Sequence, residues 1–340
     1  MVSRALAAQA NGLAITWAEL DEGFRPIPCH CGAYAVPALL AEAEATGATL
    51  SDLLRALAVS YDVSTRIALT FPFRTLTVHP HGGFNAIGAA AALASLRGFD
   101  AATFKAAITA AATMVAPGPF NHATKGALVR NVWTSIGAVA GFRAADFAPL
   151  GITGLDTALT DVFLHNFASK IEPSALDSGL GVDAWQIGRG YHKMYACCQY
   201  MHASVEAALD LAASHGTGLA GRIDAIEVET HALGLALSND KPETVLAAKF
   251  SLPHAMAAAA LFGSGGAEGF EGTTLDDPRF VDLRGKVKLL QHGAIGEWPN
   301  DRPGKVRWIL SDGEVLSAES LNARGGVDQP FSDPRLIIRP

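Results

Sequence analysis

The sequence predicts a mainly α protein that consists of a large all-helical domain, residues 1–186, and a smaller α+β domain, residues 187–328. Two patterns predict this division. The first half of the chain contains one segment after another with apolar residues at helical spacing, whereas the second half contains segments in which apolar and polar residues alternate. The length of 340 residues and the 49% hydrophobic content are enough for one large or two ordinary domains.

Three helices are predicted in the first hundred residues. Residues 31–45, which are rich in Ala and Leu, have the composition of a buried helix. Residues 49–69 carry apolar side chains on one helical face, with Ser51 as the candidate N-cap. Residues 85–98 are rich in Ala and Gly, and we expect this helix to begin at Asn85. Because small side chains let helices approach closely, we expect a compact bundle.

Two more helices complete the predicted helical domain. The helix over residues 100–115 begins at Asp100, a residue type that caps helix N-termini well. Residues 129–151 repeat the helical spacing, and Gly141 and Gly151 are interpreted as breaks in it.

The second domain mixes strands and helices. In residues 222–230 the apolar Ile and Val alternate with Glu, which is typical of a half-exposed strand. Residues 305–319 alternate in the same way around Asp312-Gly313, which predicts a β-hairpin. Helical stretches are expected over residues 202–214 and 243–262. The domain boundary is placed near Gly188.

The composition excludes several classes of protein. The chain carries 26 basic and 33 acidic residues, a net charge of −7, and no basic cluster, which argues against nucleic-acid binding. No run of about 18 or more uncharged apolar residues predicts a membrane span, and the N-terminus lacks a signal-peptide core. The few, closely paired cysteines favour the reducing cytoplasm over a disulfide framework. These cysteines are Cys29, Cys31, Cys197 and Cys198.

Histidines are the first candidates for chemistry, since His is the usual proton carrier near neutral pH. His30 and His79 each lie in a loop directly before a predicted helix, and His254 follows a Pro at another helix start. Helix N-termini favour anions, so these positions would suit an acidic substrate. The alternative is that each histidine only caps a helix or packs.

Two other places offer polar groups. The segment YHKMYACCQYMHASVEAALDL contributes Lys193, Cys198 and His202. The lysine can bind a carboxylate or donate a proton, and it can equally be a solvated loop charge. Arg130 lies beside an apolar stretch, where its guanidinium can present a buried fork to a carboxylate.

A zinc site is the alternative interpretation of the cysteines. Cys29 and Cys31 flank His30, and Cys197 adjoins Cys198. Neither pair has the C-x₂₋₄-C spacing of a zinc knuckle, and adjacent ligands strain tetrahedral geometry, so we expect no metal. The sequence also lacks a P-loop, a dinucleotide fingerprint, a nucleophile elbow and an H-E-x-x-H motif.

Four segments in the same order resemble the MmgE/PrpD family, which includes 2-methylcitrate dehydratase, cis-aconitate decarboxylase and an iminodisuccinate epimerase. The resemblance extends from QANGLAITWAELDEGF to LNARGGVDQPFSD, through nearly the whole chain. The four segments are HCGAYAVPALLAEAEA, HPHGGFNAIGAAAALASLRGFD, KMYACCQYMHASVEAALDL and AAKFSLPHAMAAAALFG.

The resemblance implies a fold and an assembly. It implies that the smaller domain is a lid over the helical domain, that the chain is a homodimer, and that the active site binds neither metal nor cofactor. It also implies that residues 1–186 lack the family's first helices and that residues 329–340 begin a C-terminal return to the helical domain.

The resemblance also assigns roles to residues of this chain. His30, His79, Lys193, His202 and His254 match catalytic positions. Asp21 (or Glu22), Arg130 and Cys198 match substrate-binding positions. Cys198 stands where decarboxylase-like members carry His, and His254 where many members carry Tyr. These two departures argue against cis-aconitate decarboxylation and leave dehydration, epimerisation or another lyase reaction open.

The sequence therefore predicts a cofactor-independent lyase that acts on a small di- or tricarboxylate, in the manner of 2-methylcitrate dehydratase. In this hypothesis His79 or His30 removes a proton next to a carboxylate, and His202 or His254 protonates the leaving hydroxyl. Arg130 and Lys193 hold the carboxylates and stabilise the developing charge. The alternatives are an epimerase of an iminodisuccinate-like acid and a non-catalytic member of the family.

Overall fold

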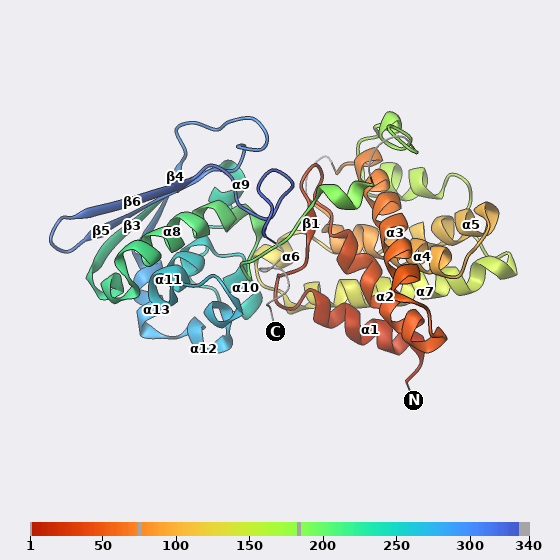
Figure 1. Ribbon diagram of the computed structural model, residues 1–340, viewed down its shortest axis with the longest axis horizontal. Coiled ribbons are helices and arrows are strands. Elements are labelled where there is room, and N and C mark those ends of the chain that lie inside the picture. The colour runs from red at the N-terminus through yellow and green to blue at the C-terminus, as the bar shows by residue number, and fades with distance from the viewer. Residues whose placement is uncertain (1, 74–76, 182–184, 333–340) are drawn as a thin grey trace. The chain divides into compact units, whose positions relative to one another are not determined.

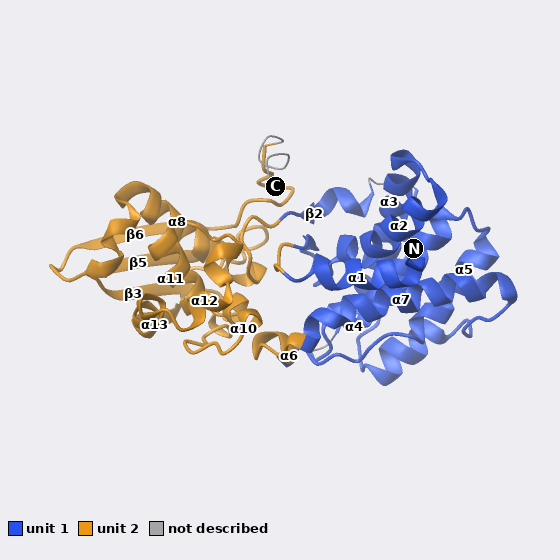
Figure 2. Cartoon of the chain, turned by 90° about the horizontal axis from the view of Figure 1, so that it is seen from below, with its two compact units in different colours: residues 1–17, 21–121, 129–192 blue, residues 18–20, 122–128, 193–340 orange. Residues whose placement is uncertain are grey.

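The computed structural model describes residues 2–73, 77–181 and 185–332 and is mainly helical, as the sequence predicts. The chain forms two compact units, shown in different colours in Figure 2. Unit 1 consists of Met1–Trp17, Asp21–Asn121 and Val129–His192. Unit 2 consists of Ala18–Leu20, His122–Leu128 and Lys193–Pro340. The boundary predicted near residue 187 and the role of the second unit as a lid stay predictions.

Unit 1 is a bundle of six helices of eight or more residues among the described residues, labelled in Figure 1. They are α1 Arg4–Ile15, α2 Cys31–Thr46, α3 Leu50–Thr70, α4 Pro80–Leu96, α5 Ala101–Ala112 and α7 Val132–Phe147. A two-stranded ribbon joins β1, Gly23–Phe24, to β2, Gly190–Tyr191. A π-helix, Thr160–Asn166, follows α7. The short helix α6, Asn121–Thr124, lies between α5 and α7 in the chain, and its residues from His122 onward belong to unit 2.

Helix α4 is the centre of the bundle and packs against α2, α3, α5 and α7. Almost all of its side chains are buried, and most of them are Ala or Gly. A Cβ atom at Gly88 would lie 2.6 Å from the Cβ of Tyr34, and one at Gly141 of α7 would lie 2.4 Å from the Cβ of Ala89. Gly141 is therefore a contact point between helices, and its interpretation as a break in the helix is wrong.

The helix starts depend on caps that the sequence shows only in part. Asp100 caps α5, as predicted. Helix α3 begins after Thr49, whose side chain accepts from the N–H of Asp52 in a capping box, and not at Ser51. Helix α4 begins at Pro80 and not at Asn85, because proline fits the first turn of a helix and the ring of His79 caps it.

The sheet of unit 2 has the strand order β4-β3-β5-β6. The strands are β3 Ile223–Thr230, β4 Val287–Gln291, β5 Gly304–Leu310 and β6 Val315–Ser320. The predicted strand at 222–230 and the predicted hairpin at 305–319 are confirmed, and Gly313 has the positive φ of +88° that the hairpin turn requires. Strand β4, which pairs in parallel with β3, was not predicted.

Helices cover one face of this sheet. Helix α8, His202–His215, packs on strands β3, β5 and β6, and α11, Leu252–Phe262, packs on α8 (Figure 1). The inward side chains of the strands, with Trp308 the largest, lie in the core between them. The helix predicted over 243–262 is divided, because α10, Val245–Lys249, ends at its C-cap Phe250 and Ser251 caps the new helix α11.

The remaining described helices of unit 2 are short. They are α9 Ala232–Leu235, α12 Gly272–Leu275 and α13 Pro278–Gly285. The predicted return over residues 329–340 falls mostly on 333–340, outside the described residues. Within the described part of the chain, the helices are too short or too polar to cross a membrane.

Candidate active site

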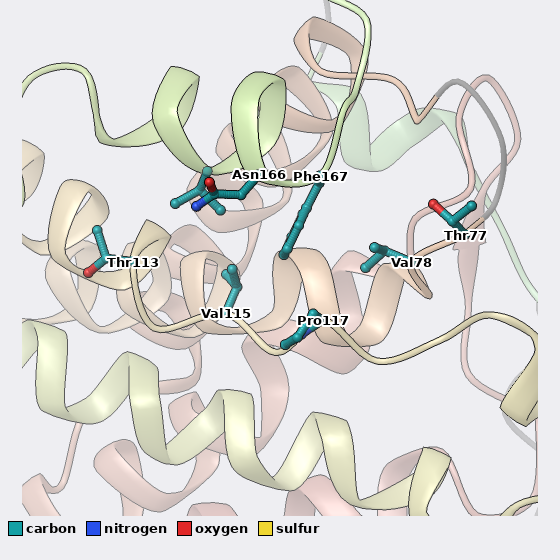
Figure 3. A pocket seen from close by; sticks show the side chains of 8 residues that line it. Thr77, Val78, Thr113, Val115, Pro117, Asn166 and Phe167 are labelled. Atoms are coloured by element: carbon teal, nitrogen blue, oxygen red, sulfur yellow. The ribbon is translucent and has the colours of Figure 1, made fainter.

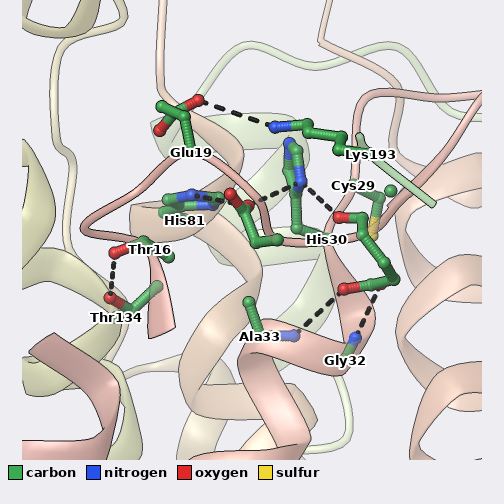
Figure 4. A network of polar contacts seen from close by, with 12 residues as sticks. Thr16, Glu19, Cys29, His30, Gly32, Ala33, His81, Thr134 and Lys193 are labelled. Atoms are coloured by element: carbon green, nitrogen blue, oxygen red, sulfur yellow. Dashed lines mark hydrogen bonds and ion pairs between the residues drawn. The ribbon is translucent and has the colours of Figure 1, made fainter. Parts of the chain in front are cut away.

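Polar side chains from four parts of unit 1 meet near the N-termini of α2 and α4. Asp21 precedes strand β1, His30 stands at the N-cap of α2, and His79 stands at the N-cap of α4. His81 lies in the first turn of α4, and Arg130 lies in the 3₁₀ turn Leu128–Asn131 before α7. Figure 4 shows part of this cluster.

Asp21 and His30 form the closest pair of the cluster. The Nδ1 atom of His30 lies 2.9 Å from Oδ2 of Asp21 and 2.6 Å from the backbone oxygen of Glu22. A carbonyl oxygen can only accept a hydrogen bond, so Nδ1 must carry the proton. In the neutral ring the lone pair is therefore on Nε2, which is the tautomer that a general base requires.

His79 has the opposite tautomer. Its Nδ1 atom accepts a hydrogen bond of 3.2 Å from the backbone N–H of His81, so in the neutral ring the proton is on Nε2. The ring stacks on Phe120, with centroids 5.5 Å apart, and packs against Trp133. His79 is thus held as a proton donor, whereas His30 is held as a proton acceptor.

His81 was not among the predicted site residues. Its ring lies between those of His30 and His79, with centroid distances of 4.7 and 4.6 Å, and its Nε2 atom lies 3.5 Å from Oδ2 of Asp21. Burial, followed by the charge of Arg130, lowers the pKa of His81 well below its usual value, so the ring is neutral. The sequence signal that could have found it is its place in His-Pro-His, one residue into the same helix as His79.

Glu22 is the residue that the sequence could not separate from Asp21. Its carboxylate accepts hydrogen bonds of 2.8 and 3.3 Å from the N–H groups of Gly32 and Ala33 in the first turn of α2 (Figure 4). A Cβ atom at Gly32 would lie 2.7 Å from Oε2 of Glu22, so only glycine allows this approach. Glu22 therefore caps α2, and Asp21 contacts the histidines. Burial is the main reason that the pKa of Glu22 is raised.

The cysteines that flank His30 point into the core. The Sγ atoms of Cys29 and Cys31 lie 3.1 Å apart, and both residues belong to the apolar core of unit 1. Burial raises the pKa of the Cys31 thiol well above its usual value. Both residues are thus small packing neighbours, and neither forms a disulfide.

Arg130 is almost fully buried, with 1% of its surface exposed. Its Nη1 atom donates to Oδ1 of Asn131 at 3.1 Å. Its charge is close enough to lower the pKa of His81, so this guanidinium belongs to the same cluster. A buried guanidinium beside the neutral ring of His81 is suited to bind an anion such as a carboxylate.

Three of the predicted residues lie together in unit 2. Lys193 forms a buried ion pair with Glu19, in which Nζ and Oε2 are 3.6 Å apart (Figure 4). Burial is the main reason that the pKa of His202 is lowered to about 3 and that of Cys198 is raised to about 11, with the charge of Lys193 acting on both. At neutral pH the imidazole and the thiol are therefore uncharged, and the ammonium is the cation of this group.

His254 lies apart from these residues, in the core of unit 2. Its Nε2 atom is 2.9 Å from the backbone oxygen of Gly269, and its Nδ1 atom is 3.2 Å from Nη1 of Arg284. The ring packs between Phe270 and Phe280. Burial lowers its pKa to about 4. These contacts are those of a histidine that holds the core together, and the catalytic role expected for it stays a prediction.

A cavity of about 500 Å³ opens in unit 1 beside the loop that carries His79 (Figure 3). Its lining is mixed and consists of Thr77, Val78, Thr113, Val115, Pro117, Val162, Asn166 and Phe167. None of the clustered histidines or acidic residues lines it, so it is distinct from the candidate site.

Within the cluster, Asp21, His30 and His81 offer oxygen and nitrogen atoms within 4.8 Å of one another, the donor types of a metal site.

Comparison with known families assigns both halves of the chain. The profile of the MmgE/PrpD N-terminal domain matches residues 1–165, and that of the MmgE/PrpD C-terminal domain matches residues 195–337. A search among curated proteins finds no match. The chain therefore belongs to the MmgE/PrpD family, whose members are generally enzymes such as dehydratases and isomerases.

Proposed function

We propose that this protein is a lyase that removes water from a small di- or tricarboxylate, in the manner of 2-methylcitrate dehydratase, with acid and base groups of its own chain. One observation carries the proposal. His30 and His79 are held in opposite tautomers within one cluster, so one ring accepts a proton at Nε2 while the other donates one there. Family membership supports the reaction class.

His30 is the base in this proposal. The proton next to a carboxylate is only weakly acidic, so its removal requires an oriented base and stabilisation of the enolate-like charge. Asp21 fixes the ring of His30 through Nδ1–H and stabilises the imidazolium that forms when Nε2 takes the proton. Arg130 supplies positive charge for a substrate carboxylate.

His79 is the acid. As the C–H electrons form the C=C bond, the C–O bond on the neighbouring carbon breaks, and the hydroxyl takes the Nε2 proton of His79 and leaves as water. The cycle closes when His30 returns its proton to solvent and His79 takes one up. In this proposal His79 is the acid in place of His202 or His254. Lys193 and Cys198 keep their predicted roles in substrate binding as proposals.

The same pair of histidines also suits an epimerase, because inversion of a carbon requires one group to remove the proton and another to return it. Both reactions begin with loss of the same proton. They differ in whether an unsaturated acid appears.

Proton NMR in D₂O, with the purified protein and citrate-, aconitate- and aspartate-like acids, tests the proposal. We expect vinylic signals of an unsaturated acid from one member of the panel, together with deuterium incorporation. His30→Ala should abolish both, whereas His79→Ala should retain deuterium exchange and lose dehydration. The exposed His165→Gln serves as the matched control and should behave as wild type.

Full turnover by His30→Ala would overturn the assignment of the base. Deuterium exchange at one carbon without an unsaturated product would replace dehydration by epimerisation. If the folded protein gives neither turnover nor deuterium exchange with any acid of the panel, the proposed enzymatic activity is contradicted and a non-catalytic member of the family is favoured.

A further inference from the structure

The proposed reaction leaves His81 without a role, although this side chain is the least explained in the cluster. His81 is fully buried, and neither of its ring nitrogens has a hydrogen-bond partner among the described residues. An imidazole placed in the interior without such partners is unfavourable unless it serves a ligand. Its Nε2 atom faces Oδ2 of Asp21 at 3.5 Å, the same oxygen that Nδ1 of His30 contacts at 2.9 Å.

We propose that Asp21, His30 and His81 form a binding site for a divalent transition-metal cation of the Zn²⁺ type, which blocks the catalytic base when it is bound. Two neutral imidazoles and one carboxylate are a ligand set that first-row divalent metals accept. Zn²⁺ takes nitrogen and oxygen ligands at about 2.0–2.2 Å, which places neighbouring ligands of a tetrahedral site about 3.3 Å apart. The donor atoms here approach that spacing and all lie within 4.8 Å.

The surroundings define the remaining coordination. The backbone oxygen of Glu22, 2.6 Å from Nδ1 of His30, is a fourth donor atom next to these three. The thiols of Cys29 and Cys31 contact each other in the core and are not part of the donor set. The guanidinium of Arg130 opposes a dication, while the Asp21 carboxylate favours it.

Binding of the cation changes the tautomer of His30. A metal bound at Nδ1 displaces the proton from that atom, and the neutral ring then carries its proton on Nε2. The ring loses a proton at Nδ1 and gains one at Nε2, so its charge is unchanged. The lone pair on Nε2, which would remove the substrate proton, is then no longer available. The cation and the proposed reaction therefore exclude each other. This inhibitory consequence rests on the proposed function, whereas the site itself does not.

Binding of Zn²⁺ alone to the chelator-treated protein, measured by calorimetry, tests the site without substrate. We expect one Zn²⁺ per chain, and at least about tenfold weaker binding to His81→Gln and to the isosteric Asp21→Asn. The exposed His165→Gln should bind as wild type. Circular dichroism checks that each variant is folded, and the conservative Asp21→Asn keeps the test valid if His81→Gln does not fold.

Equal affinity in all these variants, or no binding by wild type, would overturn the site. A loss of affinity in a Cys29→Ser, Cys31→Ser double variant, with an intense thiolate-to-cobalt charge-transfer band in the Co²⁺ protein, would move the metal to the thiols and equally overturn it. The proposed site predicts only weak d–d bands of a nitrogen- and oxygen-ligated Co²⁺.

Measurements of turnover with and without Zn²⁺ separate this inference from the proposed function. Reversible inhibition by Zn²⁺ that disappears with a chelator, and that is weaker in His81→Gln, supports both. An active enzyme that binds no Zn²⁺ at these residues refutes the site and leaves the function intact. Binding of Zn²⁺ at these residues without inhibition of turnover confirms the site, refutes its inhibitory consequence and shows that His30 is not the base.

Discussion

At the scale of single residues, the candidate site depends on the contact between Asp21 and His30 and on the buried ring of His81 beside them. Asp21 meets His30 through β1 and the start of α2, and His81 enters the cluster because α4 is buried on nearly all sides. Such contacts depend on how these segments pack, so the sequence missed His81. His30 and His79 were predicted, because a histidine directly before a helix start is visible without the fold.

Asp21→Asn tests the orienting pair. The substitution keeps the size of the side chain but removes the negative charge that stabilises the imidazolium of His30. We expect kcat to fall by about 10²–10⁴-fold with little change in KM, because the charge acts mainly in the transition state. Steady-state kinetics check this, and a variant with wild-type kcat would contradict the role of Asp21.

His254 gives the protein a dependence of stability on pH. Its pKa is lowered to about 4 in the folded state, against about 6.5 in the unfolded chain, because burial disfavours the charged ring. The unfolded state therefore binds more protons, and stability that is present above pH ~6.5 is lost as the pH falls towards 4. We expect a loss of about 3 kcal/mol in the free energy of unfolding from this group.

Urea unfolding at several pH values between 4 and 8 measures that slope. His254→Gln, which can still pair with Gly269 and Arg284 but does not titrate, should make the slope less steep and leave the part that His81 and His202 contribute. An unchanged slope in this variant would assign the acid sensitivity to other groups, of which His202, with a pKa of about 3, is the next candidate.

At the scale of elements, the sequence predicted where helices and strands lie better than where they start. Alternation of apolar and polar residues predicted β3 and the β5–β6 hairpin, since that pattern reflects burial directly. It could not show that Gly141 is a contact point on α7, because a glycine looks the same in the sequence whether it breaks a helix or allows another helix to approach. Only the packing of α4 against α7 distinguishes the two cases.

Gly141→Ala tests that contact. The added Cβ would lie 2.4 Å from the Cβ of Ala89 and 2.8 Å from the backbone oxygen of Ala86, so α7 must move away from α4. We expect a loss of stability of about 1–3 kcal/mol, although alanine favours helices more than glycine does. Thermal unfolding measures it. Gly188→Ala, whose Cβ meets nothing within 4 Å, is the control and should leave the melting temperature unchanged.

At the scale of the whole molecule, the mainly α fold was visible in composition and periodicity, but the membership of short segments in the two units was not. Residues 18–20 and 122–128 belong to unit 2 although the first half of the chain forms unit 1. They are too short to show periodicity, so only the folded contacts assign them.

The homodimer that the family resemblance implies stays a prediction, and the surface of unit 1 offers a place to test it.

Helix α1 and its neighbour α7 expose several large apolar side chains. Leu6 and Leu13 of α1 are 55% and 39% exposed, and Ile136 of α7 and Trp17, two residues after α1, are about half exposed. Exposed apolar surface of this kind favours association. We expect light scattering to give twice the 35.4 kDa of one chain, and Leu6→Glu with Leu13→Glu to shift the mass towards one chain. A monomeric wild type would contradict the dimer.

The parallel pairing of β3 with β4 has a consequence for the order in which unit 2 folds. Strand β3 lies between β4 and β5, yet residues 231–286 are synthesised between β3 and its first partner. The finished strand therefore emerges from the ribosome with both edges unpaired, a state that is prone to aggregate. The β5–β6 hairpin closes locally, whereas pairing of β3 with β4 and β5 joins segments far apart in the chain. We therefore expect completion of the sheet to be a slow, late step of folding.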